Sequence, residues 1–144
     1  MEFKPWATTV QPYDTSYEGL YINLVVPTAE TTRQSFLIDI HKHNMKGLLF
    51  VGIAGTGKTT IIKNYFSGLD PEKDVTGAIN FNSYTDSYGL QMVIQSHVEK
   101  RTGKIQGPPP GKKLLFFMDD LNMPFVETFG SQGPICLIRQ IIDY

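Results

Sequence analysis

The sequence contains a single cysteine, Cys136, and therefore cannot form an internal disulfide bond. This fits a reducing intracellular compartment better than secretion, and we expect the cysteine to be a small core residue on a helix. No run approaches the roughly 20 apolar residues that a membrane-spanning helix needs. The opening "MEFKPW" has neither the basic nor the apolar segment of a signal peptide. These absences predict a soluble protein without a targeting signal and with no membrane partner.

An excess of charge of either sign is also missing, because 13 Lys and Arg residues are matched by 14 Asp and Glu residues. The basic residues are scattered along the chain, so we do not expect nucleic acid or an anionic membrane as a partner. His41, His43 and His97 have no cysteine or carboxylate at metal-ligand spacing, which predicts surface positions rather than a metal site. At 144 residues the chain has the length of a single domain.

Short apolar runs alternate along the chain with segments of helical periodicity. An unbroken apolar run is typical of a strand covered on both faces of a parallel sheet. Strands are predicted at 47–51, 78–82 and 114–118. Helices are predicted at 29–44 with a cap at Thr28 or Thr31, from the glycine-rich loop to Gly68, from a cap at Thr85 or Ser87 through Val98, and from Pro134 through Ile142. The order predicts a parallel, three-layer α/β domain.

Two segments are predicted to be irregular. Residues 1–27 combine prolines and aromatic residues without a sustained period, and we expect Trp6 to anchor this lead-in. Residues 102–113 contain three consecutive prolines, which lack amide donors and disfavour helix in the residues before them. This second segment is therefore predicted to be a loop.

The segment "GIAGTGKTT", residues 52–60, matches G-x-x-x-x-G-K-[ST], the phosphate-binding loop of many nucleotide-binding proteins. Its glycines let backbone N–H groups converge on an anion, and the following helix adds the positive end of its dipole. We expect Lys58 to reach the β- and γ-phosphates and the Thr59 hydroxyl to hold Mg²⁺. The pattern predicts a nucleoside triphosphate site.

The segment "LLFFMDD", residues 114–120, is an apolar strand that ends in two carboxylates. On its own such a pair is typical of a solvated turn. Combined with the upstream loop, it predicts that Asp119 is a second ligand of Mg²⁺ and that Asp120 orients or deprotonates the attacking water.

Three further polar residues have two interpretations each. Asn80 and Asn82, at the end of the second predicted strand, both suit the capping of the following turn, or one of them hydrogen-bonds Asp120 and aims it. Arg139, on the last predicted helix, suits a salt bridge on the helix surface, which we favour, or a contact with a neighbour's nucleotide.

Together these segments resemble a known family. "GLLFVGIAGTGKT", "INFNSYTDS", "EKRTGKIQGPPPGKKLLFFMDDLNMP" and "GSQGPICLIRQIIDY" resemble the third AAA+ module in the motor ring of dynein heavy chains, most closely the axonemal ones. The resemblance runs from about residue 3 to residue 144. It implies a P-loop NTPase fold of the AAA+ type, a three-layer sandwich with a parallel sheet.

The resemblance also implies roles for individual residues. Residues 52–59 become the Walker A loop, residues 114–120 the Walker B segment, and Asn80 the switch asparagine that acts with Asp120 in catalysis. Mg²⁺ is held by Thr59 and Asp119. The residues implied around ATP or ADP are Val26, Pro27 and Thr28 near the adenine, and Gly52, Ala54, Gly55, Thr56, Gly57, Lys58, Thr59 and Thr60 in the loop.

In that family, this module binds ADP or ATP and regulates the main power stroke rather than supplying it. The implied partners are neighbouring AAA+ modules of the same heavy chain and, through the rest of that chain, dynein intermediate and light chains and microtubules. The implied location is the cytoskeleton of the cytoplasm or the axoneme of a cilium or flagellum. Residues 1–27 would be a lead-in from the preceding module, and residues 28–144 part of the large AAA+ subdomain.

Two departures from the family pattern affect these expectations. AAA+ Walker B segments usually end in Asp-Glu, whereas Asp120 is one methylene shorter, and a misplacement of about 1 Å can cost on the order of a hundredfold in rate. The sequence also stops before the sensor 1 strand and the helical lid, so we expect a fragment that is inactive alone. Without that strand, residues 48–51 and 114–118 should lie about 10 Å apart with no ladder between them.

Three functions remain open from the sequence. The first is an ATP-binding, slowly hydrolysing regulatory module of a dynein motor that acts in microtubule-based movement. The second is a structural module that ADP or ATP stabilises without turnover. A GTPase or small-molecule kinase is disfavoured, because the chain lacks the N-K-x-D guanine motif.

Overall fold

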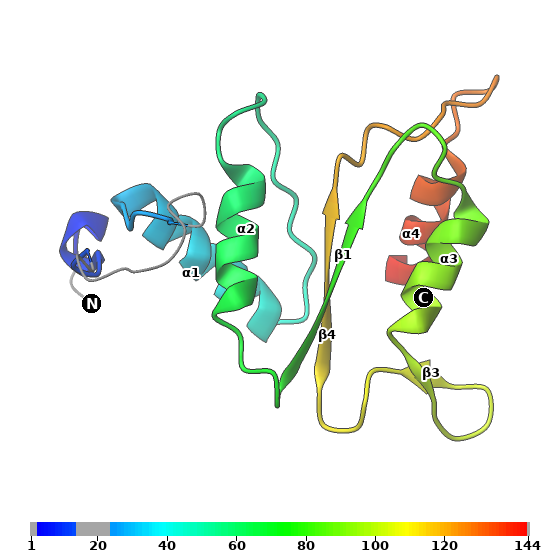
Figure 1. The fold of residues 1–144 in the computed structure, drawn as a ribbon, viewed down its shortest axis with the longest axis horizontal. Coiled ribbons are helices and arrows are strands. Elements are labelled where there is room, and N and C mark those ends of the chain that lie inside the picture. The colour runs from blue at the N-terminus through cyan, green and yellow to red at the C-terminus, as the bar shows by residue number, and fades with distance from the viewer. Residues whose placement is uncertain (1–2, 14–23, 144) are drawn as a thin grey trace. The chain divides into compact units, whose positions relative to one another are not determined.

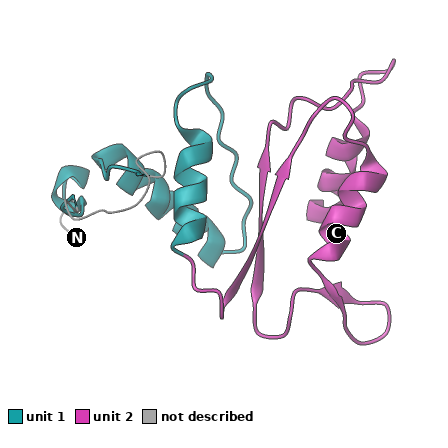
Figure 2. Ribbon diagram, in the orientation of Figure 1, with its two compact units in different colours: residues 1–68 teal, residues 69–144 magenta. Residues whose placement is uncertain are grey.

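The computed structural model describes residues 3–13 and 24–143. The chain forms two compact units, Met1–Gly68 and Leu69–Tyr144 (Figure 2), which are described separately below. The first unit carries the glycine-rich loop between two helices, and the second carries a parallel sheet covered by helices. Within the described residues, no helix is long and apolar enough to cross a membrane.

The first unit contains the 3-10 helix η1 (Trp6–Thr9), helix α1 (Ala29–His43) and helix α2 (Lys58–Ser67) (Figure 1). The rings of Trp6 and Phe36 have their centroids 5.2 Å apart, so η1 packs on α1. This contact confirms that Trp6 anchors the start of the chain. The Tyr65 hydroxyl donates a hydrogen bond of 2.8 Å to the Asp39 carboxylate, which links α2 to α1.

Both ends of α1 are fixed by local hydrogen bonds. Thr28, one of the two predicted candidates, is the N-cap. Its hydroxyl accepts a hydrogen bond from the Thr31 amide, and the Thr31 hydroxyl accepts one from the Thr28 amide. At the other end Met45 has a left-handed backbone (φ 54°), and the Lys46 amide donates to the His41 carbonyl at 2.9 Å. This is the hydrogen-bond pattern of a Schellman cap, with methionine in the position that glycine usually takes.

The predicted strand at 47–51 is not formed. Among the described residues none pairs with this segment, and Leu49 and Val51 are 68% and 85% exposed. An apolar run supplies strand propensity, but a strand exists only when a neighbour completes its ladder of hydrogen bonds. The prediction from the apolar run was therefore wrong for this structure.

The second unit is built on strands β1 (Asp74–Asn80) and β4 (Lys113–Asp119), which pair in parallel from Asp74 opposite Lys113 to Asn80 opposite Asp119 (Figure 1). The predicted strand at 114–118 is confirmed. The strand predicted at 78–82 lies earlier than expected, at Asp74–Asn80, and its added part includes Asp74 and Gly77, two residues of poor strand propensity. Pairing along the whole length of β4 overrides that propensity.

Helices α3 (Ser87–Ser96) and α4 (Gly133–Asp143) cover one face of this sheet (Figure 1). Burial alternates from Thr76 to Asn80 in β1, so that Ile79 faces the helices while Asn80 faces the opposite side. The core is formed by Ile79, Phe81 and Leu90, with Ile94, Phe116, Met118, Leu121, Leu137 and Ile138 packed around them. The sheet and this helix layer are two of the layers that the sequence predicts.

Between α3 and β4 the chain forms a short antiparallel hairpin that the sequence analysis did not predict. Strands β2 (Glu99–Lys100) and β3 (Gln106–Gly107) pair across a tight turn. The Arg101 guanidinium donates to the Pro108 carbonyl at 2.6 Å and so ties the hairpin to the proline run. The prolines of this loop were correctly predicted to be irregular, but the residues just before them pair.

Predictions about burial need correction at Cys136 and at two of the histidines, since His41 is partly buried as well as His97. Cys136 lies on α4 as expected, but it is exposed rather than part of the core. His97 is partly buried, because its ring packs edge-on against Phe116 with the centroids 5.1 Å apart, and its Nδ1 lies 2.9 Å from the Val93 carbonyl. Cys136 lies on the exposed face of α4, whereas His97 is the C-cap of α3 and packs against β4.

Gly77 lies under the Phe116 ring, and we predict that Gly77→Ala destabilises the chain. An added Cβ would lie 2.5 Å from Cε1 of Phe116 and 3.1 Å from Nε2 of His97. Overpacking of this kind typically costs about 1–3 kcal/mol. Urea unfolding would measure the loss, and Gly47→Ala is the matched control, because a Cβ at Gly47 meets nothing within 4 Å. Equal stabilities of the two variants would contradict the prediction.

Candidate functional site

The glycine-rich loop in the first unit runs directly into α2. Gly55 and Gly57 have left-handed backbones (φ 79° and 78°), and Gly57 is the N-cap of the helix. A Cβ on either glycine would meet no atom within 4 Å, so the space beside the loop is open. These two backbone angles strain any residue with a side chain, which explains why the loop needs glycine at both positions.

The Lys58 ammonium lies over this loop. Its Nζ donates to the carbonyls of Gly52 at 3.0 Å and Ile53 at 2.7 Å, and it lies 3.3 Å from the Thr56 hydroxyl. The Thr56 hydroxyl in turn donates to the Ile53 carbonyl at 3.0 Å. The cation is thus held at the N-terminal end of α2, where the helix dipole is positive.

This arrangement fits a phosphate group. Backbone N–H groups at a helix N-terminus attract anions, and the ammonium adds a full positive charge. The glycines leave room for the anion to approach the backbone. A P-loop of this kind is in general a nucleotide-binding element that works together with Mg²⁺.

The other predicted nucleotide contacts in this unit lie at two helix starts. Thr59 and Thr60 follow Lys58 in the first turn of α2, Thr59 partly buried and Thr60 exposed. Val26 and Pro27 come just before Thr28, which caps α1. Their contacts with Mg²⁺ or adenine stay predictions.

In the second unit, β4 ends at Asp119 and Asp120 follows it. One oxygen of the Asp119 carboxylate accepts from the Asp120 amide at 3.1 Å, and the Met123 amide donates to the Asp120 carbonyl at 2.9 Å. Asp120 has a left-handed backbone (φ 56°), which the sequence analysis missed. The available signal was the residue type, because Asp and Asn adopt this conformation more readily than other residues with side chains.

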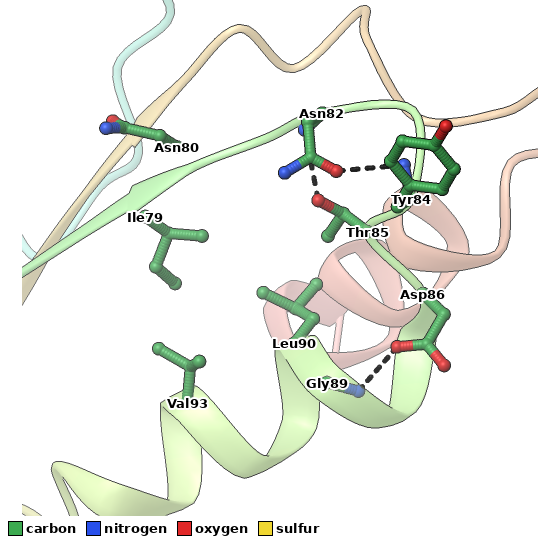
Figure 3. A pocket seen from close by; sticks show the side chains of 9 residues that line it. All are labelled: Ile79, Asn80, Asn82, Tyr84, Thr85, Asp86, Gly89, Leu90 and Val93. Carbon is green, nitrogen blue, oxygen red and sulfur yellow. Dashed lines mark hydrogen bonds between the residues drawn. The ribbon is translucent and has the colours of Figure 1, made fainter.

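The two asparagines after β1 have different environments. The Asn82 side-chain oxygen accepts from the Tyr84 amide at 2.8 Å, so Asn82 caps the turn, which was one of its two interpretations (Figure 3). Asn80 pairs in register with Asp119 and points away from Leu90 (Figure 3). Within the described residues no hydrogen bond joins Asn80 to Asp120, so its aiming role stays a prediction.

A pocket of about 320 Å³ lies between the end of β1 and α3 (Figure 3). Its apolar floor comes from Ile79, Leu90 and Val93, and its polar rim includes Thr85 and Asp86. The rim groups serve the local fold, because the Thr85 hydroxyl accepts from the Asn82 amide and the Asp86 carboxylate caps α3 through the Gly89 amide. The pocket is therefore a consequence of the β1–α3 turn.

The remaining candidates are accounted for by local contacts. Arg139 lies 3.3 Å from the Asp143 carboxylate on the same helix, which confirms the favoured salt-bridge interpretation. Across residues 3–13 and 24–143, no three His, Cys, Asp or Glu side chains gather closely enough to hold a metal ion.

Comparison with known proteins agrees with the loop and the strand that ends in carboxylates. Residues 13–144 match the family model of the P-loop containing dynein motor region. The chain belongs to this dynein motor family. Its fold is accordingly the P-loop α/β fold of the dynein AAA region, with the parallel sheet described above.

Several dynein heavy chains are similar to this dynein motor region along its whole length. It is 40% identical over 141 residues to the dynein-1-alpha heavy chain of the flagellar inner arm I1 complex of Chlamydomonas reinhardtii, covering 98% of this chain. It is 37% identical to dynein axonemal heavy chain 10 of Homo sapiens and 36% identical to the flagellar outer arm dynein beta chain of Chlamydomonas reinhardtii, covering 99% and 97% of this chain. The chain spans about 3% of the length of each of these relatives.

Proposed function

We propose that this dynein motor region is an ATP-binding regulatory AAA+ module, the third in its ring, that hydrolyses ATP slowly. The observation that carries the proposal is the Lys58 ammonium held over a glycine loop at the start of α2. Residues 52–60 would bind the phosphates, and residues 26–28 would lie near the adenine. The identity of the module rests on the sequence resemblance described above.

A magnesium site and a hydrolytic role are proposed on the basis of the sequence resemblance. The Thr59 hydroxyl and the Asp119 carboxylate are the proposed Mg²⁺ ligands, both oxygen donors of the kind that Mg²⁺ prefers. Bound Mg²⁺ would supply charge neutralisation on the phosphates. Asp120 would hold the attacking water, and Asn80, beside Asp119 in the sheet, would orient Asp120.

A second candidate function is a structural module in which bound ADP or ATP stabilises the ring without turnover. The observation that favours it is the left-handed backbone at Asp120. This backbone suits aspartate, which stands where the AAA+ pattern usually has glutamate. The binding residues are the same in both functions. Only the fate of the bound ATP separates them.

The proposed partners and location follow from the names of the relatives, which are flagellar and axonemal dynein heavy chains. We propose that the module contacts neighbouring AAA+ modules of one heavy chain. The rest of that chain would reach intermediate chains, light chains and microtubules in the cytoskeleton or the axoneme.

Calorimetric titration with Mg-ATP, Mg-ADP and Mg-GTP tests the binding proposal. We expect ATP and ADP to bind and GTP to bind at least tenfold more weakly, a difference of about 1.4 kcal/mol, because the chain has no guanine motif. The measurement belongs in the intact heavy chain, where a lid can close over the base. Equal affinity for GTP would reject the adenine-specific site.

A further inference from the structure

Thr56 joins the lysine of the loop to the loop backbone. Its hydroxyl donates to the Ile53 carbonyl at 3.0 Å and lies 3.3 Å from the Lys58 ammonium. The same Ile53 carbonyl accepts from Lys58 at 2.7 Å. Thr56, Ile53 and Lys58 therefore form a closed triangle of polar contacts.

We propose that the Thr56 hydroxyl is a positioning group that holds the Lys58 ammonium ready for phosphate. The proposal rests on the proposed function, in which this loop binds the phosphates of a nucleotide. The Thr56 hydroxyl acts through Lys58 and does not need to touch the nucleotide, whereas the Thr56 backbone belongs to the phosphate-binding loop.

The reason lies in the flexibility of lysine. Its ammonium is a compact charge on a four-carbon stem with several rotatable bonds, so an unanchored lysine loses rotamer freedom when it binds an anion. Three oxygen acceptors already fix Lys58 in this loop. A group that is fixed before the ligand arrives lowers the entropic cost of binding.

The hydroxyl, rather than the bulk of the side chain, carries this role. Thr56 is exposed, and the loop takes its shape from Gly55 and Gly57, which hold the left-handed backbone on either side. Thr56→Val keeps the branched shape and removes the hydroxyl, whereas Thr56→Ser keeps the hydroxyl. The two variants therefore separate the polar contact from packing.

A double-mutant cycle tests the proposal with Mg-ATP as the probe in the intact heavy chain. Thr56→Val should weaken binding by about three- to tenfold, the size of one lost hydrogen bond, and Thr56→Ser should stay within about twofold. In a Lys58→Ala background, Thr56→Val should have no further effect, because its target is gone. Additive effects, or a serine variant as weak as the valine variant, would overturn the proposal.

A second readout needs no nucleotide. Acetylation of Lys58 by an N-hydroxysuccinimide ester, followed by mass spectrometry, should be at least twofold faster in Thr56→Val than in the unchanged protein or in Thr56→Ser, because an amine with one contact fewer is more mobile and more accessible. Lys63, on the exposed side of α2, is the internal reference. Faster acetylation without any ATP binding would reject the proposed function and keep the positioning role; unchanged acetylation would reject the positioning role.

Discussion

Replacing Lys58 with alanine is expected to weaken Mg-ATP binding by about thirtyfold or more. The ammonium lies at the N-terminus of α2 within 3.0 Å of two loop carbonyls, so it is already where a phosphate would meet the helix dipole. Loss of one charge-assisted contact in a partly dry site costs roughly 2 kcal/mol, which corresponds to a loss of affinity of about thirtyfold. Calorimetry on the intact heavy chain would measure it.

The matched control is Lys63→Ala, five residues along the same helix. Lys63 is exposed and lies outside the loop, so its removal tests the general loss of a positive charge from α2. We expect the affinity of the Lys63→Ala variant for Mg-ATP to stay within about twofold of the unchanged protein, since solvent and salt screen the interaction of an exposed charge with a distant phosphate. If both lysine variants bind equally well, Lys58 is not the phosphate contact.

The phosphate loop was predictable because its chemistry is local in sequence. Gly57 must adopt a left-handed backbone, and Lys58 must follow it at the first turn of a helix, so an eight-residue pattern contains the whole requirement. Helices α1 and α2 were predicted for a related reason, since caps such as Thr28 and stops such as Gly68 act within a few residues. Helix α3 was also predicted, but its N-cap is Asp86 rather than Thr85 or Ser87.

The failures concern features that depend on distant residues. Residues 47–51 have the composition of a strand, yet composition supplies no partner for the ladder. Conversely, β1 extends back to Asp74 and includes Gly77, two residues of poor strand propensity, because β4 offers a partner at every position. Pairing is a property of two segments, and a reading of one segment at a time misses it.

The site after β4 was predictable only in part. Two carboxylates at the end of an apolar strand indicated a position for Asp119 and Asp120 at the carboxyl edge of the sheet, and the structure has them there. The left-handed backbone of Asp120 arises from the turn that Met123 closes, which no strand or helix pattern encodes. Similarly, Asn82 binds the turn while Asn80 stays beside Asp119, because Asn80 is the last residue of β1 and Asn82 lies beyond it in the turn.

The turn at Asp120 determines which substitution can test catalysis there. Alanine would remove the carboxylate and also place a strained residue at φ 56°, so two effects would be mixed. Asparagine has nearly the same shape, tolerates the left-handed backbone and lacks the charge. Asp120→Asn should therefore keep the turn, and its urea unfolding curve should match that of the unchanged protein within about 0.5 kcal/mol.

Asp120→Asn is expected to lower ATP hydrolysis at this module by about a hundredfold or more and to leave Mg-ATP affinity nearly unchanged, because a general base contributes to the reaction and not to ground-state binding. Single-turnover experiments on the intact heavy chain measure the rate of ATP hydrolysis. The part of that rate that is lost in Lys58→Ala defines the hydrolysis that occurs at this module. Glu72→Gln, which neutralises an exposed carboxylate in the turn before β1, is the control and should change nothing. If Asp120→Asn retains all of the hydrolysis that occurs at this module, or if Lys58→Ala lowers the hydrolysis rate of the heavy chain not at all, the enzymatic function is rejected and the structural module stands.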